Sequence, residues 1–110
     1  MEPLILDHLY RKLKIAVIIP AYRVEKQIEN VVTLIPKFIN KIIIIDDFSP
    51  DGTKFLIYRL AHKDKRIILI QHKQNQGVGG SMKSGFDMAN KLGMEIIIKL
   101  DGDGQMNPKY

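Results

Sequence analysis

The sequence predicts an α/β fold, a Rossmann-like, doubly wound parallel sheet whose elements follow in the order β-α-β-α-β-α-β. Four short isoleucine-rich runs show no polar alternation, which is typical of parallel strands that are covered on both faces. These runs are residues 15–19, 42–45, 67–70 and 96–98. Helical patterns separate them, and right-handed crossovers between such strands build a doubly wound sheet.

Each helical pattern has one apolar stripe that would pack on the sheet. The patterns cover residues 25–39, where Pro36 disturbs the end, residues 53–62, and residues 78–92, where Gly93 follows the C-cap. The positions expected to face inward are Ile28, Val31, Val32 and Ile35 in the first helix, Leu56 and Leu60 in the second, and Met82, Phe86, Ala89 and Leu92 in the third.

Length and composition indicate one small domain with anionic partners. The chain has 110 residues, of which 45% are hydrophobic and 26% charged, and a formal net charge of +5. That charge favours nucleotide phosphates or an anionic membrane surface. The basic residues are scattered and lack interleaved aromatics, so we expect no nucleic-acid partner.

The sequence also bears on where the protein works. It contains no cysteine, which excludes disulfides and thiolate metal sites and fits a reducing compartment. We recognise no signal peptide, and no apolar run approaches the roughly 20 residues of a membrane span. We therefore expect a cytoplasmic protein whose contact with a membrane, if any, is peripheral and at the cytoplasmic face.

Polar side chains follow three of the four predicted strands. Ligands of an open parallel sheet bind outside the carboxyl ends of its strands. Here those ends are followed by residues 20–22, 46–49, 72–75 and 101–103. Segments far apart in the sequence are therefore expected to meet in one crevice.

Asp46 and Asp47 are adjacent carboxylates at the end of the second strand, where burial is costly without a cation or hydrogen-bond donors. Either one could accept a hydrogen bond from a nucleobase N–H or a ribose hydroxyl. Asp51, by contrast, is expected to cap the turn formed by residues 49–52.

The glycine-rich segment 75–81 opens the third helix. Glycines there let the backbone approach a ligand and leave helix N–H groups available to an anion. Tight packing of the helix on the sheet explains the same glycines equally well. The segment matches neither the P-loop nor the G-x-G-x-x-G pattern.

Asp101 and Asp103 stand one residue apart directly after the last strand. Two such carboxylates can face one hard cation, Mg²⁺ or Mn²⁺, which shares its ligands with substrate phosphates. A calcium-binding EF-hand is excluded because Met106 stands where that loop needs glycine. A phosphatase of the haloacid dehalogenase type is similar only locally, since it would have Thr or Val in place of Gln105. A metal–diphosphate site is the favoured interpretation.

The remaining candidates have less specific signals. The three histidines, His8, His62 and His72, have no metal-ligand spacing and are expected at the surface or at strand ends. Tyr22 ends the first strand, where it could stack on a base or belong to the core.

Four segments in this order resemble family 2 glycosyltransferases with the GT-A fold, and most of all the branch that transfers sugars to dolichyl or polyprenyl phosphate. They are residues 18–22, 45–53, 75–79 and 101–105. The resemblance implies an N-terminal extension over residues 1–13. It also implies that residues 14–110 are the nucleotide-sugar-binding half of a catalytic domain truncated at its C-terminus.

For the nucleoside, the resemblance implies a wall formed by Pro20, Ala21 and Tyr22. Asp47, in preference to Asp46, would hydrogen-bond the base. Two positions depart from the family pattern: Arg23-Val24 stand where Asn-Glu is frequent, and Val78 stands where Lys or Arg is frequent. Glu25 would then supply the carboxylate missing from position 24.

For the diphosphate, the resemblance implies that Gly77 and Lys83 lie beside the nucleotide. Asp101 and Asp103 would form the family's DXD motif. In it, Asp103 would ligate Mg²⁺ or Mn²⁺, and Asp101 would contact the ribose or the metal.

The expected function is a metal-dependent, inverting glycosyltransferase that uses a nucleotide-diphosphate sugar and a lipid-phosphate or saccharide acceptor, in cell-envelope polysaccharide or glycolipid synthesis. The catalytic base would lie beyond Tyr110, so we expect residues 1–110 alone to show no turnover. A non-catalytic nucleotide- or metal-binding module of the same fold is the alternative.

Overall fold

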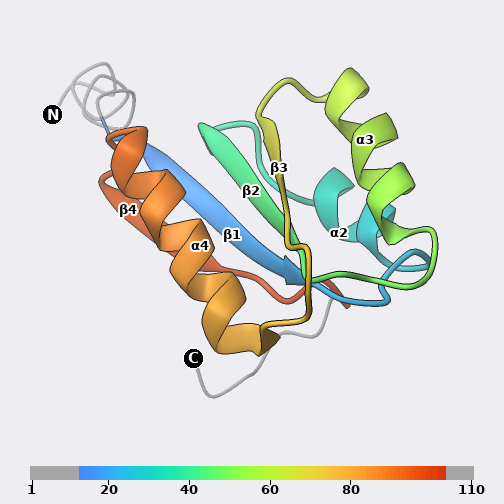
Figure 1. The fold of residues 1–110 in the computed structure, drawn as a ribbon. Coiled ribbons are helices and arrows are strands. Elements are labelled where there is room, and N and C mark those ends of the chain that lie inside the picture. Colours follow the sequence, from blue (N-terminus) through green and yellow to red (C-terminus); the bar gives the residue numbers. More distant parts are fainter. Residues whose placement is uncertain (1–12, 104–110) are drawn as a thin grey trace, which may run out of the picture.

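A four-stranded parallel sheet runs through the centre of the computed structural model, which describes residues 13–103. The strands are β1 (Ile15–Ala21), β2 (Lys41–Asp46), β3 (Ile67–Gln71) and β4 (Ile96–Lys99). Their spatial order is β3-β2-β1-β4, and every neighbouring pair is parallel (Figure 1). The predicted strands and their parallel arrangement are confirmed. The predicted N-terminal extension falls almost entirely on residues 1–12, outside the described part.

Helices cover both faces of the sheet, as the doubly wound fold requires. They are α2 (Ile28–Thr33), α3 (Thr53–Lys63) and α4 (Gly77–Lys91). Helix α4 packs on one face of β1 and β2, while α2 and α3 pack together on the opposite face (Figure 1). Among the helices of residues 13–103, none combines the length and apolarity needed to cross a bilayer.

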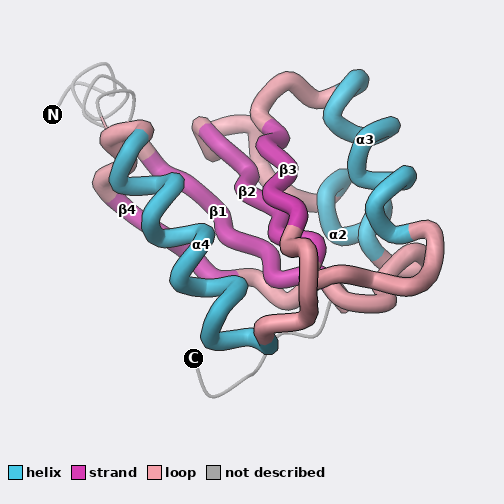
Figure 2. The backbone as a smooth tube through the Cα atoms, in the orientation of Figure 1, coloured by secondary structure: helices cyan, strands magenta, loops and turns pink. Residues whose placement is uncertain are grey.

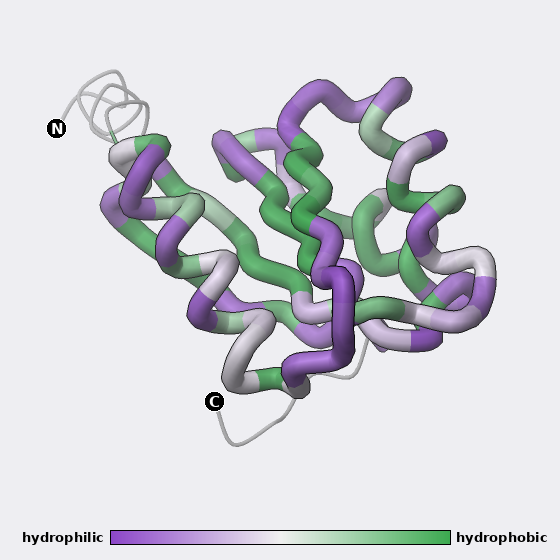
Figure 3. The backbone as a smooth tube through the Cα atoms, in the orientation of Figure 1, coloured by the Kyte–Doolittle hydropathy of each residue, from purple (hydrophilic) through white to green (hydrophobic). Residues whose placement is uncertain are grey.

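The two-sided burial predicted for the strands holds for the centre of the sheet only. In β1 and β2 the aliphatic side chains are buried, and these strands form the hydrophobic centre of Figure 3. In β4, Ile96 and Ile98 are 39% and 45% exposed. Within residues 13–103, strand β4 pairs only with β1 and is the edge strand of the sheet. None of the described helices covers its exposed side chains on the face where α2 packs.

Helix α2 is shorter than the 15-residue pattern that predicted it. Its apolar stripe is correct, because Ile28, Val31, Val32 and Ile35 are all buried. The helix ends at Thr33 and continues as a tight turn, with Ile35 N–H bonded to the Val32 carbonyl. Pro36 cannot donate a helical hydrogen bond and disfavours helical geometry in the residue before it.

The face that helix α4 presents to the sheet agrees only in part with the prediction. Met82 packs against the core as predicted, whereas Phe86, also expected to point inward, is 44% exposed. The buried positions are Ala89, which was predicted, and Ser81 and Gly85, which were not. These small residues are spaced four apart and form one row along the helix. Their size lets the helix axis approach the strands more closely than a row of large side chains would.

The C-terminus of α4 confirms the role predicted for Gly93. This glycine has φ of +72°, and its N–H donates to the Asn90 carbonyl. Met94 N–H donates to the Ala89 carbonyl, which completes a Schellman motif. The chain thereby reverses direction into β4.

Candidate functional site

A crevice of about 330 Å³ lies outside the carboxyl ends of β1 and β4. The connecting loops that surround it gather at one end of the sheet, as Figure 2 shows. Strand order changes direction between β1 and β4, which is where open α/β sheets bind ligands. The crevice is lined by seven of the residues predicted for the site, namely Pro20, Ala21, Tyr22, Asp47, Gly77, Asp101 and Asp103.

One wall of the crevice is the turn that leaves β1. Tyr22 is 45% exposed, so it is available for stacking and does not belong to the core. Arg23 adopts φ of +56°, a strained left-handed conformation for a non-glycine residue. Its N–H donates to Ser49 Oγ at 3.1 Å, and its guanidinium lies 5.6 Å from the centroid of the Tyr22 ring. The Arg23 side chain therefore brings a positive charge to this wall.

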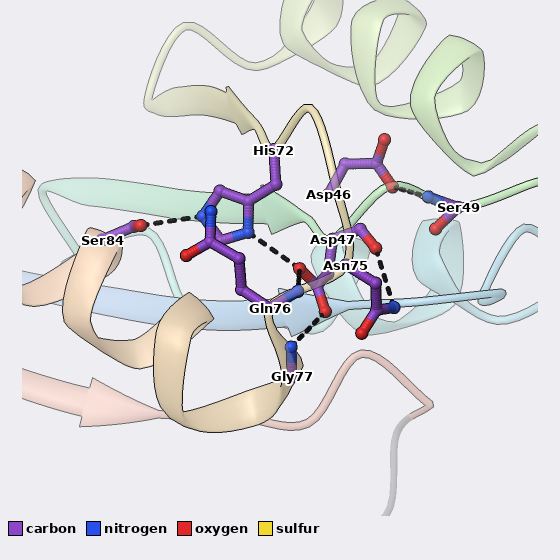
Figure 4. Close-up of polar contacts among 8 residues, drawn as sticks. All are labelled: Asp46, Asp47, Ser49, His72, Asn75, Gln76, Gly77 and Ser84. Carbon is purple, nitrogen blue, oxygen red and sulfur yellow. Dashed lines mark hydrogen bonds and ion pairs between the residues drawn. The ribbon is translucent and has the colours of Figure 1, made fainter.

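Asp47 accepts hydrogen bonds at both of its carboxylate oxygens (Figure 4). Its Oδ1 accepts hydrogen bonds from the His72 ring and from Gln76 N–H, both at 2.8 Å. Its Oδ2 accepts from Gly77 N–H, also at 2.8 Å. Burial alone would raise the pKa of Asp47, but these hydrogen bonds outweigh it and hold the pKa below its ordinary value.

Asp46 differs from Asp47 although both are buried, at 3% and 4% exposure. Its Oδ1 accepts one hydrogen bond, from Ser49 N–H at 3.2 Å (Figure 4). It lines a separate hollow, together with Phe48 and Lys54, rather than the crevice between β1 and β4. The crevice thus contains the carboxylate favoured from the sequence, although contact of Asp47 with a base remains a prediction.

The glycine-rich segment offers its helix N–H groups to an anion, as one of the two interpretations expected, and the anion is a side chain of the protein itself. The N–H groups of Gln76 and Gly77, at the N-terminus of α4, donate to Asp47. An internal carboxylate therefore occupies part of the anion site that the helix dipole creates. Gly77 adopts φ of +78°, which a residue with a β-carbon would rarely adopt.

The opposite wall is the Asp101–Gly102–Asp103 turn after β4. A β-carbon on Gly102 would lie 3.1 Å from the Pro20 carbonyl oxygen, so glycine allows the turn to pack against the end of β1. Asp101 Oδ1 lies 3.7 Å from the ammonium of Lys99. Asp101 and Asp103 both line the crevice. Sequence-distant Asp47 and Asp103 are therefore brought to one cavity, as the strand order predicted.

Within residues 13–103, no group of three or more His, Cys, Asp or Glu side chains is arranged to hold a metal ion. The donors present still fit Mg²⁺ or Mn²⁺ that is shared with a substrate. Asp101 and Asp103 offer hard oxygen ligands on the crevice wall, and substrate phosphates commonly supply further ones.

Two residues predicted for the site, Glu25 and Lys83, lie outside the lining of the crevice. Glu25 Oε2 accepts a hydrogen bond from Gly52 N–H at 3.2 Å, and Glu25 does not line the crevice. The Lys83 side chain is 80% exposed and pairs with Asp87 at 3.2 Å, one helical turn further along. Both assignments to the nucleotide remain predictions. The capping role of Asp51 is confirmed, because its Oδ1 accepts from the N–H and hydroxyl of Thr53.

Sequence reasoning missed three residues of the site. His72 does follow a strand end, as expected, but it is buried and bonded to Asp47. Ser81 lines the crevice, and its buried hydroxyl has no hydrogen-bond partner among the described residues. Arg23 was noted only as a departure from a family pattern. One signal for His72 was available: it is a polar residue directly after β3, and β3 lies beside the strand that leads to Asp46 and Asp47.

A doubly wound sheet with acidic residues gathered at a strand-order switch point defines an α/β protein that binds its ligand there. Residues 16–110 match the sequence profile of Glycosyl transferase family 2. The chain belongs to this family. Its GT-A fold agrees with the architecture of the solved relatives described below.

Two curated relatives illustrate the similarity. The chain is 38% identical to UDP-N-acetylglucosamine–dolichyl-phosphate N-acetylglucosaminyltransferase of Methanococcus voltae, over 86% of this chain and 43% of that protein. It is 30% identical to polyprenol monophosphomannose synthase of Mycolicibacterium smegmatis, over 84% of this chain and 36% of that protein. The chain thus spans less than half the length of these relatives.

Two solved structures share the fold. One is residues 1–349 of S. aureus TarS in complex with UDP, with a TM-score of 0.67, 25% identity, and coverage of 83% of this chain and 28% of that one. The other is the mannosyltransferase PcManGT of Pyrobaculum calidifontis in complex with GDP-Man and Mn²⁺. Its TM-score is 0.66 at 19% identity, with coverage of 84% of this chain and 29% of that one.

Proposed function

We propose that the intact protein is a metal-dependent, inverting glycosyltransferase. In this proposal residues 14–110 form the part that binds a nucleotide-diphosphate sugar. The observation that supports this most directly is the crevice in which Asp47 lies with Asp101 and Asp103, in a chain of family 2. Asp47 on one side of the crevice suits a ligand with N–H or hydroxyl donors at one end. Asp101 and Asp103 on the other side suit a metal-bound diphosphate at its other end.

The nucleoside would lie against Pro20, Ala21 and Tyr22, with Asp47 as acceptor for a base N–H. The ionised state of Asp47 supports this, because an ionised carboxylate is an acceptor only. The two solved relatives carry UDP and GDP-Man, so both nucleotides are donors to test. Arg23 offers a positive charge from the same wall.

Asp103 and Asp101 would hold Mg²⁺ or Mn²⁺ together with the diphosphate. A metal ion bound there would neutralise the charge that develops on the departing nucleoside diphosphate. The chain's own contribution is to place two carboxylates on one turn, which Gly102 holds close to the Pro20 carbonyl. The backbone thereby sets the distance between the metal ligands and the nucleoside wall.

The favoured acceptor is a lipid phosphate, because the two curated relatives carry names that refer to dolichyl phosphate and a polyprenol. An acceptor oxygen attacks the anomeric carbon opposite the diphosphate, and the carbon–oxygen bond to the diphosphate breaks with inversion. A phosphate oxygen is already ionised, so it needs little help from a base. Use of such an acceptor would place the protein at the cytoplasmic face of a membrane, where a net charge of +5 favours anionic lipid.

A transfer assay on the intact protein tests the proposal. Labelled UDP-N-acetylglucosamine and GDP-mannose are offered with dolichyl or polyprenyl phosphate, in Mn²⁺ or Mg²⁺ and again after chelation. We expect transfer from one donor, its loss on chelation, and a decrease of roughly 100-fold in Asp103→Asn. Glu29→Gln, an exposed acidic residue in the first turn of α2, is the control and should transfer normally.

The same assay addresses the alternative function, a non-catalytic module. Nucleotide binding without transfer to any lipid-phosphate or saccharide acceptor would favour that module. Transfer that is unchanged in both Asp101→Asn and Asp103→Asn would contradict the proposed metal site.

A further inference from the structure

Three side chains form a hydrogen-bonded row from α4 to the crevice. The His72 ring lies between Asp47 and Ser84, with Nδ1 at 2.8 Å from Asp47 Oδ1 and Nε2 at 2.8 Å from Ser84 Oγ (Figure 4). The row joins the end of β2, the end of β3 and the middle of α4. His72 N–H also donates to the Asp46 carbonyl at 3.0 Å, which fixes the histidine backbone.

The partners of the ring define the direction of each hydrogen bond. Asp47 is ionised and can only accept, so Nδ1 carries the proton and donates. In the neutral ring Nε2 is then an acceptor, and the Ser84 hydroxyl donates to it. Asp47 therefore sets the tautomer of the ring, and the hydrogen bond to Ser84 holds the ring in the orientation that it presents to Asp47.

The residue types are those of a nucleophilic Ser-His-Asp triad, but their order relative to the crevice is reversed. Asp47 lines the crevice, whereas Ser84 does not. A nucleophilic serine must reach the substrate, with its carboxylate furthest from it. Here the carboxylate is the group at the cavity, and the serine lies behind the histidine. The row therefore acts on the Asp47 carboxylate and not through Ser84.

The hydrogen bonds of Asp47 show what the row achieves. A carboxylate oxygen has about two acceptor positions. Oδ1 accepts from His72 and Gln76, so its positions are filled. Within the described part of the chain, Oδ2 accepts only from Gly77. His72 thus holds one oxygen in place and leaves an acceptor position on the other oxygen for a ligand in the crevice.

We propose that His72, oriented by Ser84, is a positioning residue that fixes the Asp47 carboxylate so that Oδ2 can accept an N–H from the nucleoside. This assignment rests on the proposed function, in which the crevice binds a nucleotide. His72 would change the affinity for the nucleotide-sugar donor, because it orients the Asp47 carboxylate. In the proposed function that carboxylate contacts the nucleoside and not the transferred sugar. Neither His72 nor Ser84 had been predicted as a site residue.

Two substitutions separate the two hydrogen bonds of the ring. In His72→Asn the amide nitrogen takes the place of Nδ1, so the bond to Asp47 is retained and that to Ser84 is lost. In His72→Gln the amide nitrogen takes the place of Nε2, so the bond to Ser84 is retained and that to Asp47 is lost. Binding of UDP and of GDP by the intact protein is measured by calorimetry with Mn²⁺ present, along with the donor KM, kcat and thermal unfolding.

We expect His72→Gln to weaken binding of the preferred nucleotide about 10-fold and to raise the donor KM equally, with little change in kcat. His72→Asn should stay within about 3-fold of the wild type. Ser84→Ala, at the far end of the row, should weaken binding by about 3-fold and supplies a second measurement if His72→Gln does not fold. His62→Asn, an exposed histidine of α3 bonded to the Tyr58 carbonyl, is the control.

If His72 had a purely structural role, both substitutions would lower the thermal stability, and both would change the nucleotide affinity by the same factor. Equal affinities of His72→Gln and His72→Asn would therefore overturn the assignment, as would unchanged binding in both His72→Gln and Ser84→Ala. In each case the proposed function survives, because the wild type still binds nucleotide. A wild-type protein that binds neither UDP nor GDP would overturn the proposed function and this assignment together.

Discussion

Gly85 of α4 packs directly on Ile18 of β1, so closely that a β-carbon on the glycine would lie 2.5 Å from Ile18 Cγ2. The same carbon would lie 3.2 Å from Cδ1 of Ile45 in β2. Both isoleucines are completely buried, so neither has space into which to move. This contact sets the distance between α4 and the sheet, and thereby the position of the Gly77 N–H that bonds to Asp47.

Gly85→Ala should therefore destabilise the protein by about 1–3 kcal/mol, because the added methyl group overpacks the core. Gly79→Ala, in the same helix, is the matched control. No atom lies within 4 Å of a β-carbon there, and alanine favours a helix over glycine. Urea denaturation of both variants measures the difference in unfolding free energy. Equal stability of the two variants would contradict the close packing of α4 at Gly85.

Asp47→Asn should destabilise the protein by about 1–3 kcal/mol, since an amide turns its NH₂ group toward one of three N–H donors. Asp46→Asn is the control, because Asp46 is equally buried but accepts one hydrogen bond, which the amide oxygen of asparagine can retain. Denaturant midpoints compare the two variants. A larger loss for Asp46→Asn would show that Asp47 is not the carboxylate that holds α4.

Acid should destabilise the fold through carboxyl groups whose pKa is lowered. Burial raises the pKa of Asp47, but hydrogen bonds, chiefly from His72, outweigh it; for Asp64 the main cause of the lowered pKa is the hydrogen bond from Arg66. A lowered folded-state pKa gives stability above the unfolded value, which is lost as the pH falls through the folded value. Unfolding free energy should therefore decrease below the ordinary pKa of 3.8.

Thermal unfolding between pH 7 and pH 2 checks this dependence. In Asp64→Asn the acidic decrease should be shallower than in the wild type, because one of the coupled carboxyl groups is absent. An identical acid profile in that variant would assign the decrease to other groups.

Ser81→Ala should leave the stability of the ligand-free protein unchanged or raise it by up to about 1 kcal/mol. The buried hydroxyl has no hydrogen-bond partner among the described residues, so its removal relieves an unsatisfied polar group. Ser81→Val would instead test the space beside Gly77, since a branched side chain would narrow the crevice. A clear loss of stability in Ser81→Ala, measured by calorimetry, would indicate a partner for this hydroxyl.

The sequence was sufficient to predict the sheet and the edge at which its acidic residues lie. Runs of isoleucine indicated the strands. Because the strands are parallel, residues 46–47 after the second strand and residues 101–103 after the fourth must lie at the same edge of the sheet. The apolar pattern predicted Ala89 correctly, but the inward position of Gly85 could not be found from hydropathy, because Phe86 is more apolar than Gly85. Close approach of helix and sheet favours the smaller side chain, and that preference depends on the neighbouring strands.

The burial of His72 was also beyond the sequence. A single histidine after a strand gives no sign of its two partners, which come from β2 and α4. Lys83 illustrates the opposite limit. A family position suggested contact with the nucleotide. The helix phase places the Lys83 side chain at the surface, where it pairs with Asp87, and contact with the nucleotide stays a prediction.

Strand β4 pairs with β1 and leaves β3 at the far edge of the sheet. Strands β2 and β4, which lead to Asp47 and to the Asp101–Asp103 turn, are therefore both neighbours of β1, although two helices and a strand separate them along the chain. Insertions or deletions between α3 and β3 can accumulate without moving either wall. A chimera that exchanges only the segment after α4 should keep the Asp47 side intact, because Asp47 is held by His72 and by the first N–H groups of α4.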